Sequence, residues 1–151
     1  MAIRYARPHS ADEVADRFDC DDLVVTALVT VGAFVALADG GIEAIERDET
    51  VNYLVRRRLA PSISRQRIAE FFDARTRQLE GRDFGGLIVE ALRPVAALSL
   101  GFDVVRIAEA VAAADRHVDA SEVQAIRLIR LVSMNSPAPK PVNSFAAWSR
   151  N

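Results

Sequence analysis

The sequence contains little that would support catalysis, disulfide formation or secretion. Cys20 is the only cysteine, so neither an intramolecular disulfide nor a thiolate metal cluster can form, which suits a reducing compartment. His9 and His117 are the only histidines, and the chain has no glycine-rich phosphate loop, His-Glu-x-x-His or Gly-x-Ser-x-Gly motif. Residues 1–14 lack the apolar run of a signal peptide. We therefore expect a cytoplasmic protein that is not an enzyme.

Neither sign of charge is in large excess. The 19 basic and 21 acidic side chains give a formal net charge of -2, which provides no field to draw the protein onto nucleic acid. The 151 residues, half of them hydrophobic, fit one globular domain with its own core. We expect no specific nucleic-acid partner.

The longest uncharged run is too short to cross a bilayer. Residues 23–38 (LVVTALVTVGAFVALA) carry no charge, and as a helix they would reach roughly 24 Å, against about 30 Å of hydrocarbon. This length favours a central helix buried on several sides over a transmembrane segment.

Helical periodicity extends over most of the chain, and no window alternates long enough for a strand. Ser10 and Glu13 read as a capping box that opens a short first helix. A second should begin at Asp21 or Asp22 and end at residues 39–41 (Asp-Gly-Gly). Five more are expected at about 43–59, 62–79, 84–95 with a break at Pro94, 102–115 and 119–133. The fold class is thus all-α, a single compact bundle of about seven helices.

The end of the chain differs from the rest in composition. Residues 134–151 contain Pro137, Pro139 and Pro141, which predicts an extended or disordered tail with Phe145 and Trp148 as candidate anchors. The helical domain should therefore occupy residues 1–133.

An internal repeat appears when residues 111–122 are laid over residues 35–46, at an offset of 76. Both copies read as an apolar helix, Asp, two residues, a β-branched aliphatic, an acid, two residues and Glu. We therefore predict two pseudo-repeated acidic helical hairpins, at about 22–59 and 102–133.

Each hairpin turn places three acids within eight residues, and two interpretations compete. The acids can cap the second helix of each hairpin, where free amides and the helix dipole favour carboxylates. They can also offer oxygen ligands to a divalent cation at each turn. His117 would add a nitrogen ligand to the second site, although an exposed turn histidine is the simpler interpretation. The six acids are Asp39, Glu43, Glu46, Asp115, Asp119 and Glu122.

The two motifs, ALADGGIEAIE (36–46) and AAADRHVDASE (112–122), resemble the paired Asp-Gly-x-Ile … Glu hairpins of the tellurite-resistance TerB family. The likeness spans about residues 20–133. It implies a bacterial all-helical stress-response protein of about seven helices, whose acidic pockets, here those six acids, bind a divalent metal cation. Arg116 departs from the pattern by replacing a glycine, which disfavours a cation at the second turn.

The resemblance further implies a protein partner, of the kind of the TerC membrane protein, at the inner face of the membrane. The alternative is a helical interaction module without metal. It would dock an acidic partner through an Arg-rich face, although a solvated helix face is the simplest interpretation of such a charge run. That face comprises Arg56, Arg57, Arg58, Arg65 and Arg67.

Overall fold

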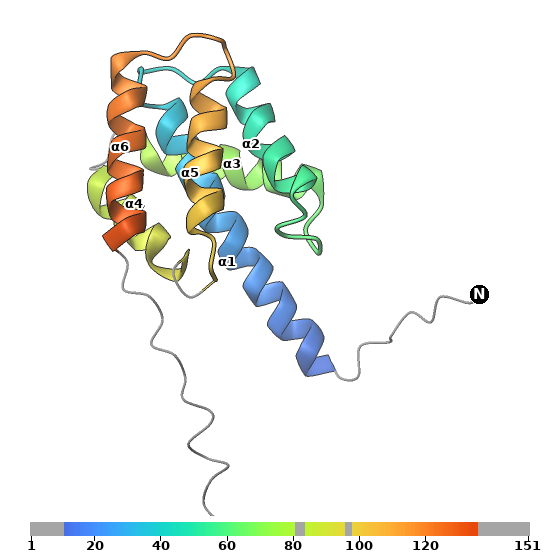
Figure 1. The fold of residues 1–151 in the computed structure, drawn as a ribbon. Coiled ribbons are helices and arrows are strands. Elements are labelled where there is room, and N and C mark those ends of the chain that lie inside the picture. Colours follow the sequence, from blue (N-terminus) through green and yellow to red (C-terminus); the bar gives the residue numbers. More distant parts are fainter. Residues whose placement is uncertain (1–10, 81–83, 96–97, 136–151) are drawn as a thin grey trace, which may run out of the picture.

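The computed structural model describes residues 11–80, 84–95 and 98–135 of the chain (Figure 1). This part is an all-α bundle in which six α-helices and one 3-10 turn are found and no strand. The elements are α1 (Ala11–Ala36), α2 (Ala44–Arg56), α3 (Arg65–Leu79), α4 (Phe84–Leu92), η1 (Arg93–Val95), α5 (Gly101–Ala112) and α6 (Ala120–Asn135).

The predicted number of helices was too high by one. The first and second predicted helices form the single helix α1, because residues 11–36 contain Gly32 but neither proline nor a glycine near the expected boundary at Asp21. Pro94 acts as predicted: α4 ends at Leu92 and the chain continues as η1. The proposed cap Ser10 lies outside the described residues.

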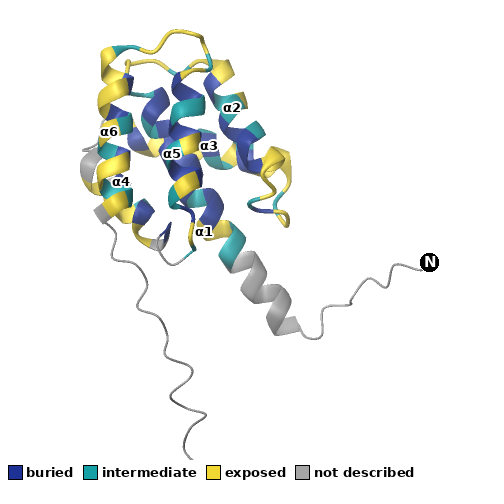
Figure 2. Cartoon of the chain, in the orientation of Figure 1, coloured by how far each residue is buried: buried dark blue, intermediate teal, exposed yellow. Residues whose placement is uncertain are grey.

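α1 is the central helix, and every other α-helix packs against it. Its buried residues run from Val24 to Ala36 on all sides of the helix, as the uncharged run predicted. In Figure 2 buried positions gather where the helices face α1, and the connections at the top of the view are exposed. None of the described helices is both long and apolar enough to span a membrane.

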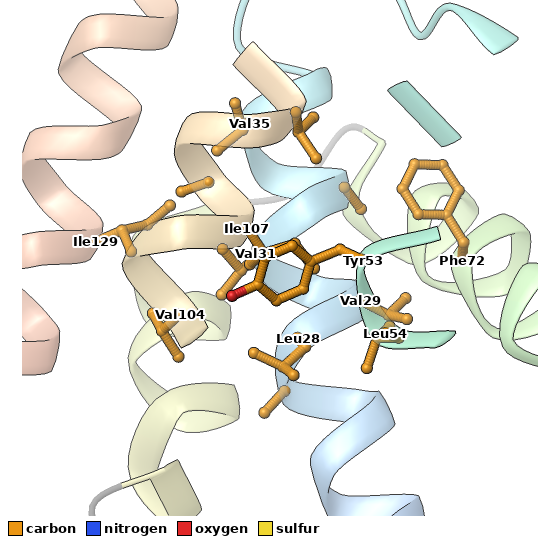
Figure 3. Packing of buried hydrophobic residues seen from close by; sticks show 14 of the residues in the cluster. Leu28, Val29, Val31, Val35, Tyr53, Leu54, Phe72, Val104, Ile107 and Ile129 are labelled. Atoms are coloured by element: carbon orange, nitrogen blue, oxygen red, sulfur yellow. The ribbon is translucent and has the colours of Figure 1, made fainter. Parts of the chain in front are cut away.

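The core is mainly aliphatic and includes the aromatic residues Phe72 and Tyr53. Figure 3 shows the ring of Tyr53 among core side chains that include Val31 and Ile107, with its hydroxyl directed toward α5. There it donates a 2.9 Å hydrogen bond to Oδ1 of Asp103, which is itself buried. A buried tyrosine hydroxyl needs such an acceptor, because an unpaired one would cost the free energy of its lost hydration.

Gly32 allows α1 and α2 to approach closely. A Cβ atom built on Gly32 would lie 2.4 Å from the hydroxyl oxygen of Thr50 on α2, a separation that no side chain can adopt. Thr50 cannot turn away easily, because its hydroxyl donates to the carbonyl of Glu46. The start of α2 is therefore held tightly against α1.

Residues 136–151, with Phe145 and Trp148, lie outside the described residues, as do residues 1–10. The predicted domain boundary and tail therefore remain predictions. α6 ends at Asn135, close to the predicted end of the last helix.

Candidate acidic site

Two connections, α1–α2 and α5–α6, lie together at one end of the bundle, the top of Figure 1. Each begins with the same turn. Oδ1 of Asp39 accepts a 3.2 Å hydrogen bond from the amide of Gly41, and Oδ1 of Asp115 accepts one of 2.8 Å from the amide of His117. We call the six acids of these two connections the acidic end.

The last acid of each set, Glu46 or Glu122, caps the helix that follows. Oε2 of Glu46 accepts a 2.8 Å hydrogen bond from the amide of Glu43 at the start of α2. Oε2 of Glu122 accepts a 2.9 Å hydrogen bond from the amide of Asp119, whose Oδ1 accepts from the amide of Glu122 at 2.9 Å. These are the bonds that the helix-capping interpretation requires. They occur at positions 76 residues apart, although this local match does not extend the repeat to the whole hairpins.

Backbone conformation also matches between the two turns. Gly40 has φ of +96° and Arg116, 76 positions later, has φ of +67°. Glycine adopts this left-handed region without strain, whereas arginine pays a steric cost there. Arg116 thus departs from the glycine of the motif without changing the path of the backbone.

Glu46 and Glu122 are buried, unlike the other acids of this end. Their exposed fractions are 3% and 2%. Burial raises the pKa of Glu46 to about 7, and the negative charges of Asp39, Glu122 and Glu43 add to the increase. Burial also raises the pKa of Glu122, with further increases from Asp119, Asp115 and Asp39. Acids of both connections therefore share one electrostatic environment.

The side-chain positions do not form a preassembled metal site. Among residues 11–80, 84–95 and 98–135, no three Asp, Glu, His or Cys side chains are grouped closely enough to hold a metal ion. At least one oxygen on each of Asp39, Glu46, Asp115, Asp119 and Glu122 is engaged by a backbone amide. His117 is exposed, and its backbone amide contacts Asp115.

A hollow of about 330 Å³ adjoins this end between α1 and α6. Its lining is mostly apolar and includes Leu37 and Ala38 beside the first turn, and Ser121 and Gln124 at the start of α6. The hollow shows that the end of α1 lies close to the start of α6.

The arginines of the predicted Arg-rich face make different contacts. Arg57 contacts Asp103 of α5 through Nε at 3.2 Å, and Arg56 forms an ion pair with Glu49 at 2.8 Å. Arg58 and Arg65 instead border a hollow beside the α2–α3 connection.

Arg67 lies on α3, where it contacts Glu70 at 3.0 Å and stacks over the ring of Phe71 at 5.0 Å. Arg58, like Arg116, has a left-handed backbone, with φ of +51°, where α2 ends. The five arginines therefore differ in the elements they contact, although they are close in sequence.

Two residues near Arg57, Phe102 and Arg106, were not predicted as part of a surface. The guanidinium carbons of Arg57 and Arg106 lie 6.0 and 5.6 Å from the centroid of the Phe102 ring. Phe102 is 45 positions from Arg57, so only the packing of α2 on α5 brings them together. The sequence alone did not indicate that Phe102, an apolar residue in the first turn of a helix, would be exposed.

Comparison with protein families identifies a match over most of the chain. The model of the family described as tellurite resistance protein TerB matches residues 25–134. No curated protein and no solved structure matches the chain.

Proposed function

Because the chain belongs to the TerB tellurite-resistance family, a family of tellurite-resistance-type stress proteins that are generally not catalytic, we propose that it works by binding a divalent cation at its acidic end. The proposal includes a cytoplasmic location, in which the bound cation governs contact with a protein partner. A membrane protein of TerC type at the inner face of the membrane is the partner proposed.

The electrostatic coupling of the two turns supports this proposal most strongly. Asp39 of the first connection raises the pKa of both Glu46 and Glu122, and Glu122 raises that of Glu46. Mutual repulsion among buried carboxyl groups is relieved by a proton or by a cation. We therefore propose one site shared by the two connections, rather than one site at each turn.

The donor chemistry fits a hard cation. Carboxylate oxygens are the ligands that Mg²⁺, Ca²⁺ and Mn²⁺ prefer. Asp39, Glu46 and Glu122 each use one oxygen for a backbone amide, so the second oxygen of each can bind the ion while that hydrogen bond persists. Three such groups must draw closer together than they lie in this structure, so cation binding should tighten the two connections around each other.

Thermal unfolding with and without cation tests the proposal. A cation that binds only the folded chain should stabilise it by about 2.7 kcal/mol at a hundredfold excess over its dissociation constant. Titrations with Mg²⁺, Ca²⁺, Mn²⁺ and Zn²⁺ should give this increase for the wild type and for Glu70→Gln, an exposed acid of α3, but not for Glu46→Gln. An equal increase in Glu46→Gln would exclude the acidic end as the site.

A second candidate function is the docking of an acidic partner without metal. The observation that favours it is the exposed ring of Phe102 beside the guanidinium groups of Arg57 and Arg106. A synthetic Glu- and Leu-containing peptide should bind the wild type and lose at least tenfold in affinity for Phe102→Ala. An unchanged affinity would exclude this surface.

A further inference from the structure

Phe102 is an exposed aromatic residue in an otherwise well-packed bundle. Its exposed fraction is 64%, although it lies in the first turn of α5, whose other apolar side chains are largely buried. The guanidinium groups of Arg57 and of Arg106 on α5 contact its ring. Exposed aromatic side chains and arginines are the residue types enriched at protein interfaces.

A hollow lined by two arginines shares Arg106 with this ring contact. A cavity of about 350 Å³ lies between α2 and α5, lined by Tyr53, Arg56, Arg106, Glu109 and Ala110. The side chains of Arg56 and Arg106 are more than half exposed, and the Arg106 contact with Glu109 is loose at 3.8 Å. These guanidinium groups can therefore donate hydrogen bonds to the carboxylates of a partner without losing a buried ion pair. We call Phe102, Arg56, Arg57 and Arg106 the Phe102 surface.

The acidic end lies at the other end of α2 and α5, and its carboxylates are complementary in charge to these arginines. α2 begins at the acidic end and reaches Arg56, whereas α5 begins beside Phe102 and ends at the second acidic turn. At about 1.5 Å per residue the two ends are roughly 18 Å apart. The acidic end also exposes two apolar side chains, Ile45 and Val118, beside its carboxylates.

We propose that the acidic end of one copy of this chain docks on the Phe102 surface of a second copy. The apolar side chains of Ile45 and Val118 would cover the Phe102 ring, and the exposed acids around them would contact the arginines. The two surfaces lie at opposite ends of one chain, so they cannot meet within it, and the contact is head-to-tail. This inference rests on the second candidate function, of which it names the partner. Its test excludes divalent cations, because Asp39 is both an exposed acid of the acidic end and a proposed cation ligand.

The contact should be weak and open-ended. Each copy carries a formal net charge of -2, so attraction depends on the local surfaces and should decline with salt. A small patch of this kind is typical of transient interfaces, with dissociation constants of about 10 µM to 1 mM. A head-to-tail contact leaves one free surface at each end, which permits short chains of copies.

Sedimentation velocity in EDTA and low salt tests the proposal. We expect the mean mass of the wild type to rise with concentration up to about 1 mM, and to fall back when salt is raised from about 0.05 to 0.5 M. Phe102→Glu removes one surface and Val118→Lys the other, so each variant alone should remain monomeric. Leu131→Glu, at a residue of α6 with a similar exposed fraction of 59%, should associate like the wild type.

Mixing the two monomeric variants distinguishes head-to-tail docking from other contacts. The intact acidic end of Phe102→Glu should dock on the intact Phe102 surface of Val118→Lys and give a 1:1 dimer that grows no further. A mixture that stays monomeric, or a wild type that is monomeric at about 1 mM, would overturn the proposal. A monomeric wild type that still binds the Glu- and Leu-containing peptide through Phe102 would overturn self-docking alone and leave the acidic-partner function standing.

Discussion

The carboxyl groups of Glu46 and Glu122, 76 positions apart in the chain, lie close enough at the acidic end for the charge of Glu122 to raise the pKa of Glu46. Both also cap helices, through Oε2 in each case. The same two side chains therefore hold the connections in place and concentrate negative charge, which links the stability of this end to pH and to cations.

The raised pKa of Glu46 predicts that its contribution to stability falls as pH increases. A glutamate titrates near 4.5 without the fold and near 7 within it, so the folded chain holds the proton more tightly. The resulting stability is complete below pH 4.5 and is lost as pH rises through 7. Because the amide of Glu43 partly stabilises the charged carboxylate, we expect a loss of about 1 to 2 kcal/mol.

Glu46→Gln isolates this effect, since the amide oxygen can still accept from the amide of Glu43. Urea unfolding in EDTA should be measured from pH 4.5 to 8. Relative to wild type, the free energy of unfolding of Glu46→Gln should increase by about 1 to 2 kcal/mol as pH rises. Glu70→Gln serves as the control and should follow the wild type. A constant difference between Glu46→Gln and wild type at every pH would contradict the raised pKa.

The left-handed backbone of Arg116 predicts a stabilising substitution. Arg116→Gly removes the steric cost of φ near +67° and should raise the free energy of unfolding by about 0.5 to 1 kcal/mol. The reverse change at the matching turn, Gly40→Arg, should lower it by a similar amount. Thermal melting measures both changes in the free energy of unfolding. Changes of the same sign in Arg116→Gly and Gly40→Arg would contradict the prediction.

The close approach of α1 and α2 predicts a destabilising substitution at Gly32. Gly32→Ala would place a methyl group against the Thr50 hydroxyl and should cost about 1 to 3 kcal/mol, despite the higher helix propensity of alanine. The double variant with Thr50→Ser, which removes the Thr50 methyl group, should recover part of that loss. A Gly32→Ala variant as stable as the wild type in urea unfolding would show that the helices can separate freely.

The contact of α2 with α5 depends on Asp103, which accepts hydrogen bonds from both Tyr53 and Arg57. Asp103→Ala leaves the buried Tyr53 hydroxyl without its acceptor and should cost about 2 to 3 kcal/mol. Tyr53→Phe leaves Asp103 still paired with Arg57 and should cost about 1 kcal/mol. Equal losses in the two variants would mean that Arg57 adds nothing to this network.

The sequence predicted helices and turns better than it predicted which of them meet. Apolar spacing, Asp-Gly-Gly at 39–41 and Pro94 are local signals, and the helix ends they predicted are found within a few residues. The junction near Asp21 was mispredicted because the acids that often begin a helix can also lie within one. Propensity alone does not separate those two cases.

At the acidic end, too, local features were predictable from sequence and features that depend on packing were not. The capping roles of Glu46 and Glu122 follow from their spacing within each turn, and so they were predictable. Their burial and mutual repulsion depend on the packing of α2 and α6 around α1, which no local pattern records. The same is true of Phe102, whose contacts with Arg57 and Arg106 require α5 to lie beside α2.

Calorimetric titration of the chain with Mn²⁺ or Mg²⁺ at pH 8 measures the proposed shared site most directly. We expect one cation bound per chain, with affinity that declines toward pH 5 as Glu46 takes up its proton. Binding should be lost in both Glu46→Gln and Glu122→Gln, because each connection supplies ligands to the same ion. Two cations per chain, loss in only one variant, or no heat of binding at about 5 mM cation would contradict a site shared between the two connections.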